Sequence, residues 1–346
     1  MNRSRLLALF AVLAMPLFLA CGTPDPDPTP SPKASSHGKN RGEEAREPAF
    51  EVVREPSLFT RMRSTGQAAG VLETTVTSYV DAAGRQVDLI GAVHIAEPRY
   101  YDELEARFSS YEALLYELIA KKGARPQAGK GRDSIISRVQ KMMKSMLALE
   151  FQLEGIDYSK PNFVHADLSP QGLSDAMTAS GETMFSVMVR FLLAGQKVGA
   201  EGKSVSPLHF LFSLFAEDRA QYLKYLMAQQ LRQMDKLMAA MGQGDKGQQN
   251  VLIGARNEAC MQVLDQELKQ GKKKLGIFYG AAHLPDMEER LWKRGFTKKG
   301  EEWLIAWDAR NKKKGDDAAS RENTPGRAPA QQPANPSKSK ASRQGR

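Results

Sequence analysis

Two histidines stand at the ends of two similar apolar segments. Residues 89–95 read LIGAVHI and residues 277–284 read IFYGAAHL, so Gly-Ala-x-His occurs twice, with His94 and His283 separated by 189 positions. Neutral imidazole is the commonest metal ligand among side chains, and it is also a general base near neutral pH. A glycine three residues before each histidine permits the close approach of another group. The pair predicts a shared metal or acid–base site, and a purely architectural repeat is the alternative.

Glu117 is the carboxylate expected to complete that site. Residues 113–119 read ALLYELI, an almost continuous apolar run that is typical of a strand covered on both faces. An ionised carboxylate buried in such a strand requires a cation, a metal ion or hydrogen-bond donors. Glu117 is therefore a candidate metal ligand or proton acceptor. The alternative is a side chain that faces outward at the end of the strand.

Four further polar residues are candidates for the same site. The segment NFVHADLS places His165 and Asp167 two positions apart, and such residues share a face of an extended strand. They are candidates for metal ligation or for support of the ligands. Arg256 and Asn257 begin a predicted helix. Arg256 there suits a substrate carboxylate or a pairing with Glu117, and an ordinary surface position is the alternative.

Other catalytic templates do not occur in the sequence. There is no His-Glu-x-x-His, no Gly-x-Ser-x-Gly and no Gly-x-Gly-x-x-Gly after a predicted strand. The segment GARPQAGKG resembles a phosphate-binding loop, but its glycine spacing differs and no Ser or Thr follows Lys130. We interpret it as a flexible loop.

The elements that must position these residues follow an α/β pattern. Residues 71–80 and 86–95 are β-rich and separated by DAAGR, which predicts a hairpin. Pro98 opens a segment with helical spacing of apolar residues, and residues 113–119 follow as a strand. The C-terminal part reads helix, strand, helix and strand, with Gly271 closing the first helix. The sequence predicts a central mixed, largely parallel sheet flanked by helices, whose functional residues gather at the carboxyl ends of its strands.

An all-helical insertion is predicted between the two halves, at about residues 169–250. Ten of the 15 methionines lie between Met142 and Met241. A methionine stripe at helical spacing indicates a core, whereas an adaptable apolar surface over the mouth of the sheet is the alternative. We expect the insertion to form a lid or a substrate groove.

The N-terminal residues predict export and lipidation. Residues 1–20 have Arg3 and Arg5 followed by an apolar stretch too short for a membrane-spanning helix, which indicates a signal peptide. The segment LFLAC resembles a bacterial lipobox, which implies cleavage before Cys21 and acylation of its sulfur and its new amino group. Several acyl chains anchor a protein stably in a membrane. An ordinary secretory peptide with a chance cysteine is the alternative.

The flanks and the core differ in composition. After the lipidated Cys21, residues 21–48 form a Pro-rich polar segment that predicts a disordered tether. Residues 311–346 hold nine Lys and Arg against three Asp and Glu, so a disordered basic tail carries most of the formal net charge of +9. We therefore expect no nucleic-acid partner. Residues 49–310 suffice for one domain, and with Cys260 as its only cysteine it holds no internal disulfide.

These motifs, in this order, resemble the TraB/PrgY/GumN group, which contains the TIKI metalloproteases. Its marks are two Gly-x-x-His motifs, a Glu closing the strand after the first helix, and an Arg-Asn opening the helix before the second motif. They occur here as Gly91–His94, Glu117, Arg256–Asn257 and Gly280–His283. The resemblance implies an α/β fold shared with erythromycin esterase-like proteins and ChaN-like haem-binding lipoproteins. The chain departs from the group at Ala92, where Thr is frequent, and in its long Met-rich insertion.

The resemblance also implies a divalent-metal hydrolase site. We expect a metal-dependent hydrolase of peptides that binds Mn²⁺, Co²⁺ or Zn²⁺ through His94, His283, Glu117 and His165. Glu117 would complete the metal shell or accept a proton from metal-bound water. Arg256, with Asn257, would contact the substrate and stabilise the developing oxyanion.

Two other functions remain open from the sequence. As in the ChaN-like relatives, the two histidines would hold haem or iron without catalysis. Alternatively, a degenerate member would only bind a peptide or a partner through the Met-rich helices. In each case we expect a lipid-anchored protein of the bacterial cell envelope, at the outer membrane, because Gly22 rather than Asp follows Cys21.

Overall fold

The structure is a computed structural model that describes residues 55–66, 69–126, 147, 149–183, 186, 220–229 and 251–310. The predicted signal peptide, the lipidation site Cys21, the tether and the basic tail lie outside the described residues. So do Lys130 and most of the Met-rich insertion. Within the described part of the chain, no helix is both long enough and apolar enough to cross a membrane.

The described part of the chain contains the strands and helices that the sequence predicts there, together with further elements that it does not predict. The strands are β1 (Thr60–Gly66), β2 (Ala69–Val80), β3 (Gln86–Ala92), β4 (Ile95–Ala96), β5 (Ala113–Tyr116), β6 (Glu150–Phe151), β7 (Phe163–His165), β8 (Lys274–Gly280) and β9 (Thr297–Ala309). The helices are α3 (Pro98–Phe108), α5 (Gln152–Gly155), α6 (Pro170–Ala179), α10 (Val251–Lys269), the 3₁₀ turn η1 (Ala281–His283) and α11 (Leu284–Lys293).

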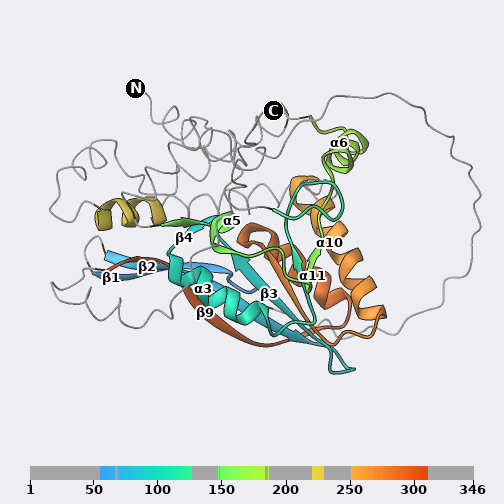
Figure 1. Ribbon diagram of the computed structural model, residues 1–346, viewed down its shortest axis with the longest axis horizontal. Helices are drawn as coiled ribbons and strands as arrows, with labels where there is room; N and C mark the ends of the chain where they lie inside the picture. Colours follow the sequence, from blue (N-terminus) through green and yellow to red (C-terminus); the bar gives the residue numbers. More distant parts are fainter. Residues whose placement is uncertain are drawn as a thin grey trace, which may run out of the picture. The chain divides into compact units, whose positions relative to one another are not determined.

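One mixed sheet of seven strands organises the described residues (Figure 1). Strands β3, β8, β5 and β7 lie side by side in that order and are all parallel. Strand β2 is antiparallel to β3, and it also pairs with β1 and β9. The α/β fold with a mixed, largely parallel sheet is therefore confirmed.

The order of the strands brings together segments that are far apart in the sequence. The predicted hairpin is formed by β2 and β3, and α3 connects β3 to β5 as expected. Strand β8, which comes from the far end of the sequence, lies between β3 and β5. A second, two-stranded sheet pairs β4 with β6. The duplicated Gly-Ala-x-His segments thus lie on neighbouring parallel strands.

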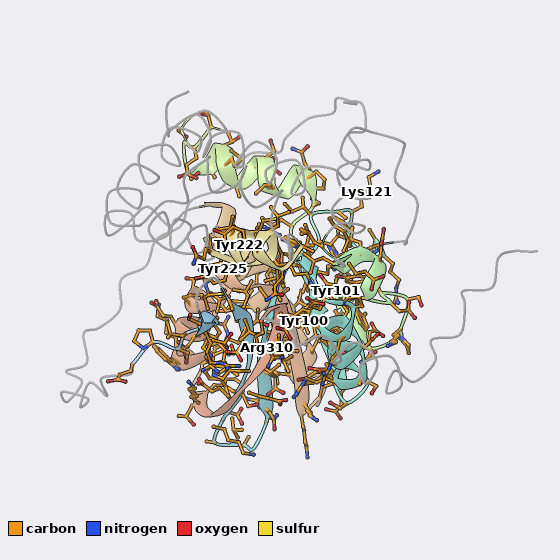
Figure 2. All side chains as sticks on the ribbon, turned by 90° about the vertical axis from the view of Figure 1, so that its left-hand side faces the viewer. Tyr100, Tyr101, Lys121, Tyr222, Tyr225 and Arg310 are labelled. Carbon is orange, nitrogen blue, oxygen red and sulfur yellow. The ribbon has the colours of Figure 1, made fainter. Side chains whose placement is uncertain are left out.

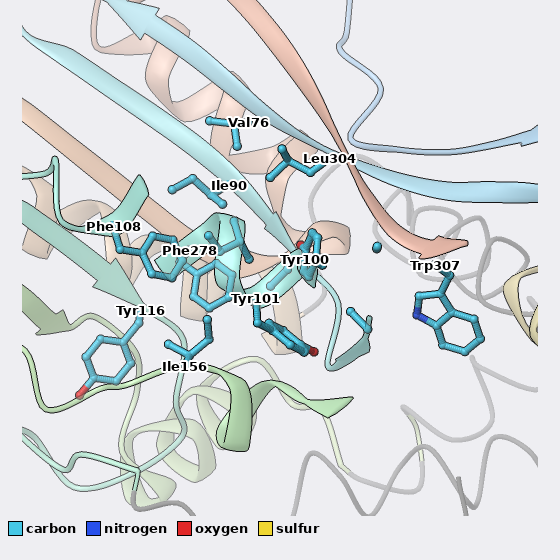
Figure 3. Packing of buried hydrophobic residues seen from close by; sticks show 14 of the residues in the cluster. Val76, Ile90, Tyr100, Tyr101, Phe108, Tyr116, Ile156, Phe278, Leu304 and Trp307 are labelled. Carbon is cyan, nitrogen blue, oxygen red and sulfur yellow. The ribbon is translucent and has the colours of Figure 1, made fainter. Parts of the chain in front are cut away.

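Side chains on the two faces of the sheet enter separate hydrophobic clusters. Ile90, Leu114 and Phe278 pack into the cluster that contains the apolar face of α3, where the rings of Phe108 and Phe278 have centroids 4.9 Å apart (Figure 3). The adjacent residues Leu89, Leu115 and Ile277 enter the other cluster, with residues of α10 and α11. This alternation is the period of two expected for strands buried on both faces. Each fully buried side chain of this kind stabilises the fold by about 1.5 to 3 kcal/mol.

Most of the described residues of the predicted insertion are helical. They form α6 and a helix over residues 220–229. In the second of these, Leu223 packs into the same cluster as α3, and Lys224 forms an ion pair with Glu97. In Figure 2, Tyr222 and Tyr225 of this helix are labelled above Tyr100 and Tyr101 of α3. The lid or groove expected for the whole insertion stays a prediction.

A buried carboxylate on α11 attaches the first described residues to the sheet. Glu288 is 1% exposed. It accepts hydrogen bonds from the Tyr79 hydroxyl at 2.7 Å, the Ser57 hydroxyl at 2.7 Å and the Ser57 amide at 2.9 Å. One side chain therefore satisfies donors from β2 and from the segment that precedes β1.

Replacing Glu288 by Gln should destabilise the fold. The neutral amide turns one of its two terminal groups into a donor, so hydrogen bonds to a charged acceptor are lost at a buried position. We expect the free energy of unfolding in urea to fall by about 2 kcal/mol. Glu289→Gln, at an exposed position of the same helix, is the matched control and should change it by less than about 0.5 kcal/mol. Equal effects of the two substitutions would contradict this role of Glu288.

Candidate functional site

Each of four neighbouring parallel strands is followed by a polar residue at the same edge of the sheet. In spatial order, β3 is followed in the chain by His94, β8 by His283, β5 by Glu117 and β7 by Asp167. Strand β3 ends at Ala92, three residues earlier than predicted, so His94 lies in the connection to β4. The carboxyl ends of parallel strands meet at the same edge, which explains how residues from distant parts of the sequence form one cluster.

Glu117 is held by the backbone of the neighbouring strand. The amide of Gly280 donates to Oε2 of Glu117 at 2.7 Å. A Cβ atom at Gly280 would lie 3.2 Å from the same oxygen, so the missing side chain at this position makes room for the carboxylate. The predicted close approach is thus confirmed at Gly280. At Gly91 the nearest atoms belong instead to Phe59, Thr74 and Thr75, and this glycine serves strand packing.

Arg256 on α10 is the cation of the site. Its Nη2 donates to Oε1 of Glu117 at 2.6 Å. Its Nη2 and Nε donate to the two oxygens of Asp167 at 2.6 and 3.0 Å. The side chains of Arg256, Glu117 and Asp167 are 4%, 9% and 0% exposed. The pairing of Arg256 with Glu117, one of the sequence-based alternatives, is therefore what the structure shows, and Asp167 is a second partner.

This pairing keeps the buried groups ionised. Burial alone would raise the pKa of Glu117, but the charge of Arg256, the two histidines and the Gly280 amide together hold that pKa well below its usual range. Burial alone would lower the pKa of Arg256, but Glu117 and Asp167 raise it above its usual value. A charge that is buried with a well-placed partner stays charged, whereas an isolated one does not.

His283 is fixed by Asn257 in one tautomer. The amide nitrogen of Asn257 donates to the His283 carbonyl at 3.0 Å and to Oδ2 of Asp286 at 2.7 Å. Both of these groups are acceptors, so the amide orientation is determined, and its oxygen faces Nδ1 of His283 at 2.7 Å. An amide oxygen only accepts, so Nδ1 carries the proton and Nε2 carries the lone pair.

Asn257 therefore has a different role from the predicted substrate contact. It is 0% exposed, and both of its polar atoms are bound to His283 and Asp286. It acts on the site by orienting His283. Nε2 of His283 lies 3.4 Å from Nη1 of Arg256 and 3.7 Å from Oε1 of Glu117.

The His283 ring is neutral at neutral pH. Burial lowers its pKa from 6.5 to about 4, and the charge of Arg256 acts in the same direction, against Glu117 and Asp167. The 3.7 Å contact with Glu117 is therefore not an ion pair at pH 7. A neutral imidazole with an unprotonated Nε2 is the form that accepts a proton or binds a metal ion.

His94 is held by a second amide side chain. Its Nδ1 lies 3.0 Å from Oε1 of Gln152, the first residue of α5, and the Gln152 amide nitrogen donates to the Tyr158 hydroxyl at 2.8 Å. The backbone of Gln152 also donates to the His94 carbonyl at 2.9 Å. No motif or periodicity distinguishes Gln152 and Tyr158, so neither residue was predicted from the sequence.

His165 is turned toward the backbone. Its Nε2 lies 2.6 Å from the carbonyl oxygen of Leu118, which accepts only, so Nε2 carries a proton and cannot bind a metal in this arrangement. A contact with a metal would have to use Nδ1. The ring also packs against Tyr116, with centroids 5.7 Å apart. Metal ligation by His165 stays a prediction.

The donor types at the site suit a divalent ion, and two of the donors already contact Arg256. Two imidazoles and a carboxylate are ligands that bind Mn²⁺, Co²⁺ and Zn²⁺. Arg256, however, contacts both Glu117 and His283, so an ion bound by these two residues would have to displace the guanidinium. Among the residues that the structure describes, no three His, Cys, Asp or Glu side chains are placed to hold a metal. We derive no chemical step through a metal.

Comparisons with known proteins do not assign the chain to a family. No family model matches the sequence, and no curated protein or solved structure is significantly similar to it.

Filling the space beside Glu117 should loosen the site. In Gly280→Ala the new Cβ would lie 3.2 Å from the carboxylate, so Glu117 must shift from the position in which it binds the Gly280 amide and Arg256. We expect the free energy of unfolding in urea to fall by about 1 to 2 kcal/mol. Gly300→Ala, in β9, is the matched control, because nothing lies within 4 Å of its added Cβ. The account of Gly280 is wrong if both variants are equally stable.

The low pKa of His283 should appear in the pH dependence of stability. As the pH falls below 6.5, the unfolded chain binds a proton at this residue while the folded chain does not until about pH 4. Folding is therefore disfavoured progressively between these values, by about 3 kcal/mol in total. His283→Gln should show a flatter decline over this interval in urea unfolding at several pH values. Superimposable pH profiles of the variant and the wild type would refute a buried neutral His283.

Proposed function

We propose that this chain is a lipid-anchored hydrolase of the bacterial cell envelope that acts on peptides. The observation that carries the proposal is the neutral His283, whose Nε2 lone pair lies beside the charged pair of Arg256 and Glu117. A proton acceptor with a cation 3.4 Å away and a carboxylate 3.7 Å away provides the components of a hydrolytic site.

His283 is the general base in this proposal. Its Nε2 takes a proton from a water molecule, whose oxygen forms a bond to the carbonyl carbon of the substrate. The proton then passes from the imidazolium to the nitrogen of the leaving amine as the carbon–nitrogen bond breaks, and the products are a carboxylic acid and an amine. Asn257 holds Nδ1–H throughout, and Glu117, 3.7 Å from Nε2, stabilises the imidazolium while it exists.

Arg256 is the oxyanion donor. Its Nε and Nη2 are bound to Asp167 and Glu117, whereas Nη1 makes only the 3.4 Å contact with His283. Nη1 is thus the guanidinium nitrogen that faces the base, and negative charge that develops on the substrate carbonyl next to His283 is stabilised by it. Two carboxylates fix the guanidinium, so it needs no reorganisation during the reaction.

The metal and haem expectations stay predictions beside this proposal. A divalent ion, if bound by His94 and His283, would polarise the carbonyl or lower the pKa of a bound water. A haem or iron-binding function without catalysis would use the same two histidines. Membrane attachment through Cys21 and the location at the outer membrane rest on the N-terminal sequence alone.

Peptide cleavage by the full chain in detergent tests the proposal. We expect new termini when wild-type protein is incubated with a random-sequence peptide mixture and analysed by mass spectrometry. His283→Ala should lower the rate by about 100-fold or more, because the proton acceptor is lost. His37→Ala, in the predicted tether, is the matched control and should cleave like the wild type.

The same assay separates the alternatives. Wild-type protein that cleaves no peptide, alone or after addition of Mn²⁺, Co²⁺ or Zn²⁺, contradicts the proposed function, and a Soret band after haem addition would then favour the binding function. Cleavage that a chelator abolishes and the ion restores would support the predicted metal in place of the mechanism drawn above. Full cleavage by a folded His283→Ala variant would exclude His283 as the base.

A further inference from the structure

Gln152 lies outside every motif of the sequence, yet it contacts the first of the two paired histidines. It is 6% exposed and begins α5, directly after the short strand β6 that pairs with β4. Its backbone amide and its side chain both bind His94, at the carbonyl oxygen and at Nδ1. This double contact ties the segment that follows β6 to the connection that carries His94.

The orientation of the Gln152 side chain decides which ring nitrogen of His94 is protonated. The amide nitrogen donates to the hydroxyl of Tyr158, which is 2% exposed and packed edge-on against the rings of Tyr116 and Phe163. The amide oxygen faces Nδ1 of His94 at 3.0 Å. Because this oxygen has no proton to donate, the hydrogen bond requires that Nδ1 supplies the proton.

We propose that Gln152, itself oriented by Tyr158, is the positioning residue that holds His94 as the Nδ1–H tautomer, with the lone pair of the ring on Nε2. The arrangement repeats that of His283, where Asn257 is oriented by Asp286 and a backbone carbonyl. Two amide side chains from different helices, α5 and α10, thus select the same tautomer for the two Gly-Ala-x-His histidines.

The tautomer of His94 determines which of its ring nitrogens can take part in the chemistry of the site. In the Nδ1–H tautomer, Nε2 is the ring atom that can accept a proton or bind an electrophile. His94 is also near enough to Glu117 to affect the pKa of that carboxyl group electrostatically. The catalytic meaning of Gln152 rests on the proposed function, whereas the tautomer of His94 does not.

Nuclear magnetic resonance of the full chain in detergent micelles, labelled with ¹⁵N only in its five histidines, tests the inference. Long-range proton–nitrogen correlation spectra at neutral pH distinguish a protonated ring nitrogen from one with a lone pair, and His94→Asn identifies the signals of His94. We expect Nδ1 protonated and Nε2 unprotonated in the wild type. Gln152→Glu, which keeps an acceptor oxygen at the end of the same side chain, should preserve this tautomer.

Two further variants should shift His94 away from the Nδ1–H tautomer. Gln152→Leu removes the acceptor, and Tyr158→Phe removes the group that orients the amide, so both should shift His94 toward the Nε2–H form that free histidine favours. Gln262→Leu, at an exposed position of α10, should leave the spectrum unchanged. On a peptide that the wild type cleaves, Tyr158→Phe should lower kcat by about 10- to 100-fold with little change in KM.

The outcomes separate this inference from the proposed function. An Nε2–H tautomer of His94 in the wild type overturns the inference, and so does an Nδ1–H tautomer that persists in both Gln152→Leu and Tyr158→Phe. If the tautomers behave as expected but the wild type cleaves no peptide, the proposed function fails and the assignment of Gln152 stands. If Tyr158→Phe changes the tautomer and leaves kcat intact, His94 is not part of the hydrolytic step.

Discussion

Two buried carboxylates at the carboxyl ends of neighbouring parallel strands need charged or hydrogen-bonding partners, and Arg256 pairs with both of them. Glu117 follows β5 and Asp167 follows β7, and both are removed from solvent by the strands and helices around them. The guanidinium binds both of them at once, so helix α10 is held against the carboxyl ends of β5 and β7. Removing one partner from such a buried network leaves an unpaired charge, which costs far more than a surface ion pair contributes.

His283 depends on the same network. Near the Arg256 charge and away from water, His283 stays neutral well below the pH at which a free imidazole is protonated. A hydrogen bond from Nδ1 to the amide oxygen of Asn257, rather than to a carboxylate, keeps this ring oriented. The cluster therefore combines a charged pair, Arg256 and Glu117, which can stabilise developing charge, with a neutral imidazole that can accept a proton.

The sequence predicts those residues of the site that lie at the ends of apolar strands. Residues that end apolar strands, such as Glu117 and His283, were identified because a parallel sheet brings such ends together, and the close approach at Gly280 followed from its missing side chain. The position of β8 between β3 and β5 was not predictable, because strand order depends on tertiary packing. Gln152, Tyr158 and the inward role of Asn257 were missed because orienting hydrogen bonds leave no periodic pattern in a sequence. The contact of His165 with a backbone carbonyl depends on a loop path that no motif encodes.

The central claim is that Arg256 and Glu117 form one buried, coupled pair, and a double-mutant cycle measures that coupling directly. The free energy of unfolding would be determined for the wild type, Arg256→Met, Glu117→Gln and the double variant at pH 7. The account predicts strong non-additivity, with the double variant more stable than the sum of the single losses implies by about 2 to 3 kcal/mol. Additive effects, within about 0.5 kcal/mol, would contradict it, because the two residues would then not share a buried site.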